Sequence, residues 1–499
     1  MAALRNNVTD IPQENLMAKD QLTIDKLISI AKRRGFIYQS SEIYGGLSAI
    51  YDYGPLGAEL KRNVRETWWR WMTQKHDNIV GIDAAIFMHP KVWEASGHVA
   101  GFNDPMIDDK TSKMRYRADM LIEDYIARLR SKGKDGKADA VQELLDTAGS
   151  RKGMCEDLQA IIMEQEIKSP DSGAFDWTEV RQFNLMFKTQ FGAASTEDDI
   201  VYLRPETAQG IFVNYKNVLD TTRLAVPFGI AQVGKAFRNE VIARQFVFRM
   251  REFEQMEMQY FVKPGSDEAA YEEWLNKRLD WHKSLGIRPE KLRFAPHPKD
   301  KLAHYARAAA DIQYEFPIGW QEVEGIHNRT DFDLSQHSEY SGKKLEYFDP
   351  QAQERYIPYV IETSIGLDRC IMMALSDAYH EEEVKGEKRT VLKLHPKIAP
   401  VTVGVFPLIK KPELAEVAKK LKEELSELFK VEYDEKGSIG KRYRRLDEAG
   451  TPYCLTIDFD TLEDQCVTLR DRNSMEQSRI GLDKVAGFVT TAIKNYRRV

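Results

Sequence analysis

The chain has 499 residues, more than one hydrophobic core usually covers, so we expect two or three domains. Apolar residues make up 42% of it, yet its longest apolar runs fall short of the roughly 20 residues that a membrane-spanning helix needs. The net charge of −6 argues against indiscriminate binding of nucleic acid, although a local patch can still bind a polyanion.

The N-terminal part is expected to be largely helical. The first twenty residues contain no apolar run of a secretory signal, and the four scattered cysteines form no CxxC pair, so we expect a cytoplasmic protein. Apolar spacing predicts a helix over Leu22–Gly35, with Gly35 as its C-cap, and a second helix from about Gly57 to Gln74. Residues 120–167 are charged and helical in pattern, with a break at Ser131–Lys137, and they resemble an insertion lying on a scaffold.

The middle of the chain changes to strand patterns. Short apolar stretches fill Val226–Val262, and Met256–Phe261 alternates side chains as a strand does. Tyr356–Ser364 is another predicted strand, and Gly366–Tyr379 is a predicted helix after it. The charge run Glu381–Arg389 is predicted to be a solvated connector.

From about Ile398 the pattern indicates an independent α/β unit. Its predicted elements are a strand over 401–405, an amphipathic helix over Glu413–Leu428, strands over Tyr453–Ile457 and Gln465–Leu469, and a final helix over Leu482–Lys494.

One segment has the composition of a nucleotide site. Arg238 and Glu240 stand two residues apart on a predicted strand, so both are expected to face the same way. Arginine grips phosphate in a bidentate manner, and the phenylalanines that follow, up to Phe253, offer a face for a purine. Taken alone, the segment is more often an ordinary exposed hairpin.

Other polar residues also have both functional and structural readings. Arg369, near the start of a predicted helix, suits a phosphate or a structural ion pair. Glu322 and Glu324, on one predicted strand face, are candidate ligands of Mg²⁺ or simply solvated. The sequence contains no Walker loop, no convincing Rossmann glycine fingerprint and no HExxH motif. Four histidines lack a metal-ligand spacing and are read as structural: His98, His304, His327 and His337.

A set of stretches in a fixed order carries a resemblance to a known family. They are Tyr53–Gly57 (YGPLG), Trp93–Phe102 (WEASGHVAGF), Tyr116–Asp119 (YRAD), Leu203–Phe212 (LRPETAQGIF), Phe237–Glu257, Gly325–Leu334 (GIHNRTDFDL) and Glu362–Arg369 (ETSIGLDR). Several are short, but together and in order they are highly specific. The chain resembles the class II aminoacyl-tRNA synthetases, and among them the homodimeric glycyl-tRNA synthetases.

The resemblance implies an α+β protein. It implies an antiparallel-sheet catalytic domain over 1–397, with a helical insertion at about 120–176, and an α/β anticodon-binding domain over 398–499. Such an enzyme joins glycine and ATP into glycyl-adenylate, releases pyrophosphate, and passes glycyl to the terminal ribose of tRNA(Gly). Mg²⁺ would accompany ATP, and a homodimer would form through the Gly57–Gln74 helix and the strand after it.

The resemblance also assigns ATP-site residues. Arg238 would contact the α-phosphate, and Glu240 would lie near the adenine amino group. Phe253 would stack on one adenine face, with Arg369 near the other face and the γ-phosphate. The predicted ATP-site set is Arg238, Asn239, Glu240, Phe248, Arg249, Phe253, Glu322, Val323, Gly366 and Arg369, with Arg238 and Arg369 catalytic. A magnesium role for Glu322 is our own hypothesis.

The expected glycine pocket is acidic. Glu206, Glu257, Glu362 and Ser364 match family positions that line the glycine site, and Arg117 matches a further substrate-contacting position. Carboxylates suit the substrate ammonium, and larger amino acids would be excluded sterically.

One segment departs from many bacterial relatives, which carry metal-binding cysteines before the YRAD element. Ile107–Arg115 has none, so we expect no structural zinc. Two roles stay open for the insertion: contact with the acceptor end of the tRNA, or a solvated scaffold.

Two other functions compete with a glycine–tRNA ligase: a synthetase-like enzyme that loads a carrier, and a noncatalytic subunit. A synthetase-like enzyme that loads a carrier often lacks an anticodon domain, which residues 398–499 supply, and a noncatalytic subunit should have lost Arg238 and Arg369. We expect tRNA contact somewhere on the C-terminal unit. Lys441–Arg445 combines cations with an aromatic ring there, and a solvated helix face is the alternative.

Overall fold

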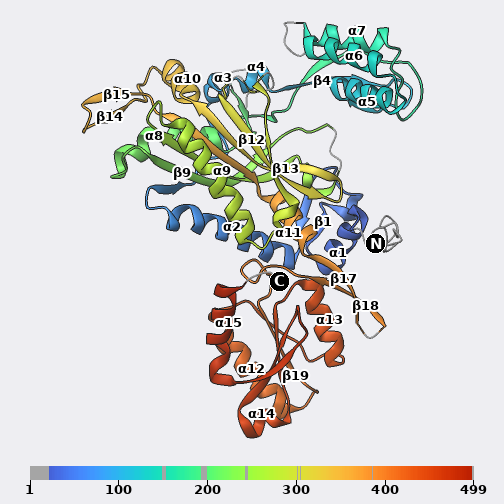
Figure 1. The fold of residues 1–499 in the computed structure, drawn as a ribbon, viewed down its shortest axis with the longest axis vertical. Coiled ribbons are helices and arrows are strands. Elements are labelled where there is room, and N and C mark those ends of the chain that lie inside the picture. The colour runs from blue at the N-terminus through green and yellow to red at the C-terminus, as the bar shows by residue number, and fades with distance from the viewer. Residues whose placement is uncertain are drawn as a thin grey trace, which may run out of the picture.

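The computed structural model describes residues 22–148, 153–192, 199–241, 245–299, 302–303, 305–384 and 386–496. The first twenty residues, expected to lack a secretory signal, and His304 lie outside this part. Figure 1 shows a central body with three insertion helices at one end and the C-terminal unit at the other. No helix in the described ranges is long and apolar enough to cross a membrane.

The central body is built around a seven-stranded sheet in the order β11-β12-β13-β16-β10-β9-β3. All neighbouring pairs are antiparallel except β3 with β9, so the expected antiparallel catalytic sheet is confirmed. The strands are β3 (Ile79–Ile82), β9 (Phe228–Phe237), β10 (Glu252–Val262), β11 (Leu292–Pro296), β12 (Ala308–Phe316), β13 (Gly319–Thr330) and β16 (Tyr359–Gly366).

The strand alternation in β10 separates two faces of this sheet. Met256 and Met258 belong to the main hydrophobic core, together with residues of α2 (Pro55–Lys75), α9 (Asp267–Ser284) and α11 (Leu367–Ala378). We call this the core face. Polar residues lie on the opposite face, the pocket face, and the predicted alternation over Met256–Phe261 is confirmed.

The predicted N-terminal helices are confirmed. The first, α1 (Ile24–Arg34), ends at Gly35, whose φ of 74° is the left-handed conformation that favours glycine. The second, α2, buries one face in the core through Leu60, Val64, Trp68 and Met72. Two short strands, β1 (Ile37–Gln39) and β2 (Tyr51–Tyr53), lie between α1 and α2, and two short helices, α3 (Pro90–Ala95) and α4 (His98–Gly101), come after β3.

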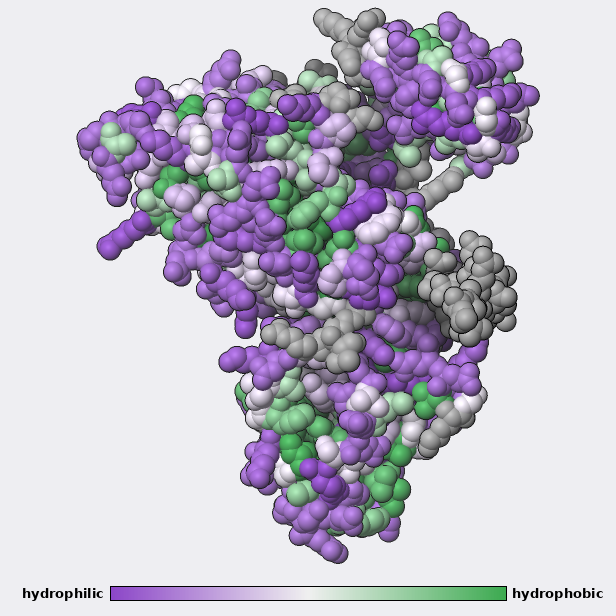
Figure 2. All heavy atoms as spheres, in the orientation of Figure 1, coloured by the Kyte–Doolittle hydropathy of each residue, from purple (hydrophilic) through white to green (hydrophobic). Residues whose placement is uncertain are grey.

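Three insertion helices, α5 (Ala118–Ser131), α6 (Asp135–Ala148) and α7 (Met154–Glu164), surround a small core of their own. The predicted break at Ser131–Lys137 contains the turn between α5 and α6. The three-stranded sheet β5-β4-β6 joins the insertion to the body, with β4 at Asn103–Asp108, β5 at Arg115–Arg117 and β6 at Arg181–Asn184. The visible surface of this insertion is mostly hydrophilic (Figure 2).

Two further pairs and two helices complete the catalytic body. The pairs are β7 (Lys188–Gln190) with β8 (Ile200–Tyr202), and β14 (Tyr347–Asp349) with β15 (Glu354–Tyr356). Helices α8 (Ala208–Thr221) and α10 (Phe332–Ser341) enclose a second core with β9 and β16. The strand predicted over Tyr356–Ser364 is β16, which begins three residues later, and the helix predicted after it is α11.

The expectation of a solvated connector at Glu381–Arg389 is wrong. The segment forms the hairpin β17 (Tyr379–Val384) and β18 (Glu387–Leu392). Its charges pair across the strands, with Glu382 opposite Arg389 and their side chains 2.6 Å apart. Opposite charges in register stabilise a hairpin, whereas the bare sequence resembled a run of solvated charge.

The C-terminal unit is a five-stranded sheet in the order β20-β19-β21-β22-β23, with its own core. Its strands are β19 (Val403–Pro407), β20 (Val431–Tyr433), β21 (Tyr453–Ile457), β22 (Cys466–Asp471) and β23 (Gln477–Gly481), and its helices are α12 (Pro412–Ser426), α13 (Ile439–Ala449), α14 (Phe459–Asp464) and α15 (Val485–Asn495). Ile398 packs in the core of the catalytic body, so a boundary at residue 398 stays a prediction.

Candidate functional site

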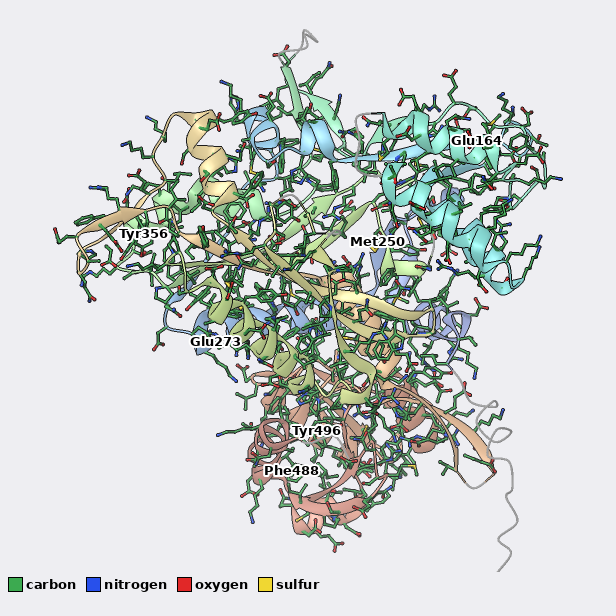
Figure 3. All side chains as sticks on the ribbon, turned by 45° about the horizontal axis from the view of Figure 1, so that its top comes forward. Glu164, Met250, Glu273, Tyr356, Phe488 and Tyr496 are labelled. Atoms are coloured by element: carbon green, nitrogen blue, oxygen red, sulfur yellow. The ribbon has the colours of Figure 1, made fainter. Side chains whose placement is uncertain are left out.

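A pocket of about 210 Å³ opens on the pocket face of the central sheet. Met250, one of its lining residues, lies near the middle of the ribbon in Figure 3. The register of three strands builds its floor: Glu257 on β10 faces Ser364 on β16, which faces Gly325 on β13. Most predicted site residues line it: Glu206, Arg238, Glu240, Phe248, Arg249, Phe253, Glu257, Glu322, Glu362, Ser364, Gly366 and Arg369.

The remaining predicted site residues do not line this pocket. Val323 is 1% exposed and packs in the main core, and Asn239 donates its backbone N–H to the carbonyl of Leu185. Arg117 forms ion pairs with Asp104 at 3.1 Å and Asp119 at 2.6 Å.

The prediction that Arg238 and Glu240 share a strand is wrong, because β9 ends at Phe237. A tight turn follows, in which the N–H of Glu240 lies 2.7 Å from the carbonyl oxygen of Arg238. Even so, both side chains reach the pocket. The guanidinium of Arg238 lies 5.3 Å from the ring centre of Phe253 and donates to the carbonyl of Pro205 at 3.0 Å.

A second arginine of the pocket also lies over a phenylalanine ring. Arg369, in the first turn of α11, lies 4.4 Å from the ring centre of Phe248 and donates from Nε to its carbonyl at 3.1 Å. It also pairs with Glu322 at 3.2 Å. Two cations and two aromatic rings therefore border one end of the pocket, an arrangement that suits the phosphates and the base of a nucleotide.

The expectation that Glu322 and Glu324 share a strand face is wrong. The pairing of β12 with β13 skips Val323, so one extra residue stands in β13 and forms a β-bulge. Glu322 faces the pocket, whereas Glu324 is fully buried on the core face. Glu324 accepts from Arg278 Nε at 2.5 Å and lies 2.7 Å from His282 Nε2, so it is not a ligand at the pocket.

The other end of the pocket gathers three carboxyl groups, those of Glu206, Glu257 and Glu362. Burial and the charge of Glu362 raise the pKa of Glu257 to about 8, and its carboxyl contacts the Thr207 hydroxyl. Burial opposes ionisation of Glu362 as well, but Arg329 and His327 lower its pKa to about 2. The group with the raised pKa thus sits beside one that stays ionised.

Glu362 is held by three side chains. It accepts from Gln259 at 2.7 Å and from Arg329 at 3.2 Å, and His327 Nδ1 lies 2.9 Å away. The ring of Tyr305 lies 3.8 Å from the Arg329 guanidinium.

The sequence predicts a structural role for His327 and no site role for Arg329, Tyr305 or Asp368, yet all four line the pocket. The first two lie within the GIHNR stretch and alternate with buried residues of β13, a signal that would have placed them beside Glu362. Asp368 anchors the α11 start by accepting from Tyr53 at 2.5 Å and Lys61 at 3.0 Å.

The cysteine-free segment near Ile107–Arg115 is organised by one buried carboxylate. Asp109 accepts from the Ser112 and Ser172 hydroxyls at 2.6 Å each and from the Thr111 N–H at 2.9 Å. Across the described ranges, no group of three or more His, Cys, Asp or Glu residues is arranged to hold a metal ion.

The three arginines of the Lys441–Arg445 segment in α13 have partners within the protein. Arg442 is buried and donates to the carbonyls of Pro407 and Leu408. Arg444 pairs with Glu387 at 2.7 Å, and Arg445 pairs with Asp434. This arrangement favours the structural reading of these arginines.

Comparison with known proteins adds a family signal that covers most of the chain. Residues 187–378 match the tRNA synthetase class II core domain (G, H, P, S and T), residues 104–147 and 133–185 match glycyl-tRNA synthetase insertion domain 1, and residues 402–491 match an anticodon binding domain.

Full-length relatives agree with these matches. The chain is 58% identical over 471 residues to a glycine--tRNA ligase of Chlorobaculum tepidum, covering 94% of this chain and 100% of the relative. It is 51% identical over 488 residues to one of Treponema denticola, covering 97% and 100%. It is 51% identical over 481 residues to one of Staphylococcus aureus, covering 96% and 100%.

Proposed function

The chain belongs to the glycine--tRNA ligase family of class II aminoacyl-tRNA synthetases and is an ATP-dependent ligase for glycine and tRNA. We propose that its pocket binds ATP at one end and glycine at the other. One observation carries the proposal. A single pocket has two arginines over phenylalanine rings at one end and three carboxyl groups at the other. ATP fits the first end, and the ammonium of glycine fits the second.

At the ATP end, Arg238 holds the α-phosphate and Arg369 the γ-phosphate, with adenine on Phe253 and Glu240 near its amino group. The Phe248–Phe253 segment, including Arg249, covers the phosphates, and Gly366 lets the nucleotide approach the end of β16. Asn239 and Val323 contribute through their main chain, because their side chains lie elsewhere.

Mg²⁺ is proposed as the companion of the phosphates, with Glu322 as its protein ligand. The side chain of Glu322 is 47% exposed on the pocket side, and one of its oxygens pairs with Arg369. Its remaining acceptor capacity fits a cation that takes one or two carboxylates and keeps phosphate and water ligands. When bound, the ion would neutralise phosphate charge.

At the glycine end, Glu206, Glu257 and Glu362 receive the ammonium, and Ser364 borders the α-carbon. Glu257 and Ser364 are paired across β10 and β16, so Ser364 stands beside the proposed ammonium site, where we expect larger amino acids to be excluded sterically. Arg117 is proposed as a later contact for the substrate, since its guanidinium now pairs with Asp104 and Asp119.

These positions suffice for the first step. A carboxylate oxygen of glycine attacks the α-phosphorus of ATP, the bond to the β-phosphate oxygen breaks, and pyrophosphate leaves with that electron pair. The nucleophile is already deprotonated, so the residues act by alignment and by charge neutralisation, with Arg238 facing the charge that builds on the α-phosphate. A terminal ribose hydroxyl of tRNA(Gly) then attacks the glycyl carbonyl, and AMP leaves.

A homodimer and a cytoplasmic location complete the proposal. The edge strand β3 and helix α2 are offered as the subunit interface, because β3 pairs with one neighbour only among the described strands. Light scattering at assay concentration should give twice the chain mass. A monomer of full activity contradicts the interface.

The function is tested by exchange of labelled pyrophosphate into ATP with each of the twenty amino acids. We expect exchange with glycine alone, followed by loading of a tRNA(Gly) transcript. Exchange with another amino acid contradicts the pocket assignment, and exchange without loading indicates a carrier-type enzyme.

A further inference from the structure

The short helices α3 and α4 bring a histidine against the acidic end of the pocket. Gly97, at a φ of 80°, makes the turn between them that aims the side chain of His98. His98 Nε2 lies 3.4 Å from Glu206 Oε2, and the two side chains are 13% and 15% exposed. The sequence pattern predicts a structural role for this histidine, and the proposed reaction does not use it.

The orientation of the imidazole is fixed on its far side. Nδ1 lies 2.8 Å from the hydroxyl of Ser96, which is itself buried. The same hydroxyl donates to the carbonyl of Trp93 at 3.4 Å, and because an ionised carboxylate can only accept, the proton on Nε2 is the one that points at Glu206. Trp93 and Phe102 hold the ring from two sides, with ring centres 5.6 and 5.3 Å away.

The other oxygen of Glu206 has its own donor. Gln209 Nε2 donates to Glu206 Oε1 at 2.9 Å, and Gln209 is held in turn by Asp333 and His337. Each carboxylate oxygen thus meets one nitrogen of the protein. Since an ionised carboxylate has about four acceptor positions, the others stay open toward the pocket.

We infer that His98, oriented by Ser96, is a positioning residue that fixes the carboxylate of Glu206 to receive the ammonium of glycine. The inference rests on the proposed glycine contact of Glu206. An imidazole N–H that donates to Oε2 holds the carboxylate in place, while the acceptor positions that face the pocket stay available to the substrate ammonium.

Helices α3 and α4, together with Phe102, form what we call the cap, and it also contacts the nucleotide end of the pocket. Phe102, at the end of α4, has its ring centre 5.4 Å from the guanidinium of Arg238. A general collapse of the cap would therefore disturb both substrates, whereas loss of the His98 donor alone would disturb glycine. This difference separates a positioning role from a structural one.

The experiment compares His98→Leu and His98→Gln in pyrophosphate exchange, with thermal unfolding as a check on folding. Losing a hydrogen bond to a charged group predicts a rise of about 10-fold or more in KM for glycine in His98→Leu, with KM for ATP unchanged. His98→Gln keeps a donor near the position of Nε2 and should restore most of the glycine affinity. Ser96→Ala should give a smaller rise of the same kind.

A double variant separates this inference from the function beneath it. In Glu206→Gln, the further change His98→Leu should not raise KM for glycine again, because the two residues act through one contact. The inference would be overturned if His98→Leu raised KM for glycine and KM for ATP equally, or if His98→Gln did not restore the affinity for glycine. It would also be overturned if the effects of His98→Leu and Glu206→Gln on KM for glycine were additive. If Glu206→Gln itself leaves KM for glycine unchanged, the proposed glycine site fails instead. Should His98→Leu not fold, Ser96→Ala and His98→Gln decide the question.

Discussion

The two faces of the central sheet both bury carboxyl groups, but with different partners. On the core face, Glu324 contacts Arg278 and His282, and all three side chains are fully buried. On the pocket face, Glu206, Glu257 and Glu362 lie together, and Arg329 is the guanidinium paired with Glu362. In the core-face cluster the charge of Glu324 is balanced by Arg278, whereas the pocket-face cluster has an excess of acid that a cationic ligand can balance. Such an imbalance marks a binding site more clearly than burial does.

The comparison predicts its largest effect on the core face. Arg278→Met would leave Glu324 buried without its guanidinium partner, so it should lower the free energy of unfolding by about 3–5 kcal/mol. Urea denaturation measures this change. The neighbouring Lys277→Met is the matched control, because its exposed pair with Glu273 is worth little.

A second change in the same cluster sharpens that test. Adding Glu324→Leu to Arg278→Met removes the stranded charge and should recover much of the loss. A stable single variant would mean that the two faces do not differ as described.

The next effect concerns the pocket face, where a cation should matter for chemistry and not for stability. Arg238→Gln should lower kcat of pyrophosphate exchange by about 10²–10³-fold, because the charge that builds on the α-phosphate loses its partner. Its urea midpoint should stay close to that of the unchanged protein. Lys235→Met, which breaks the pair of Lys235 with Glu252, serves as control and should retain activity.

The acid excess itself predicts a pH dependence. The ammonium of glycine favours the ionised form of Glu257, whose pKa in the ligand-free protein is about 8. Glycine affinity should therefore rise as the pH rises toward about 8, by at most about tenfold per unit. Glycine titration by calorimetry in two buffers should detect release of a proton. In Glu257→Gln both the rise and the release should disappear.

Stability should have the opposite dependence on pH. The folded protein holds a proton on Glu257 that the unfolded chain releases near the ordinary carboxyl pKa of about 4.5, so the contribution of this group is lost as pH rises toward about 8. The ligand-free Glu257→Gln variant should not lose this contribution to the free energy of unfolding as the pH rises. An identical pH profile in both proteins would contradict the raised pKa.

The smallest expected effect compares two neighbours on β16 that face opposite ways. Ser364→Ala should raise KM for glycine by a few-fold, about 1 kcal/mol, and leave KM for ATP unchanged. Thr363→Val, on the core face, is the matched control for glycine kinetics. Unchanged glycine kinetics in Ser364→Ala would count against its place in the glycine pocket.

Much of this arrangement was predictable from local pattern. The alternation around Met256 and Glu257 assigned the two faces of β10, and Gly35 marked the end of α1. The order of short motifs assigned the chemistry. Features that depend on pairing between distant segments were missed: the β17–β18 hairpin, the early end of β9 at Phe237, and the bulge at Val323. None of these has a local signal, because each is decided by the neighbouring strand.

The bulge gives β13 one residue more than its pairing with β12 uses, and that residue is Val323. Without Val323, Glu322 would directly precede Glu324, the pairing with Ile312 and Gln313 would become regular, and Glu322 would still face the pocket. Loss of a neighbouring paired residue, such as Gln321, would instead force part of the strand onto the opposite face. A gene for this protein should therefore tolerate an in-frame loss of the Val323 codon better than loss of a neighbouring codon, and the cost should be the buried side chain of Val323.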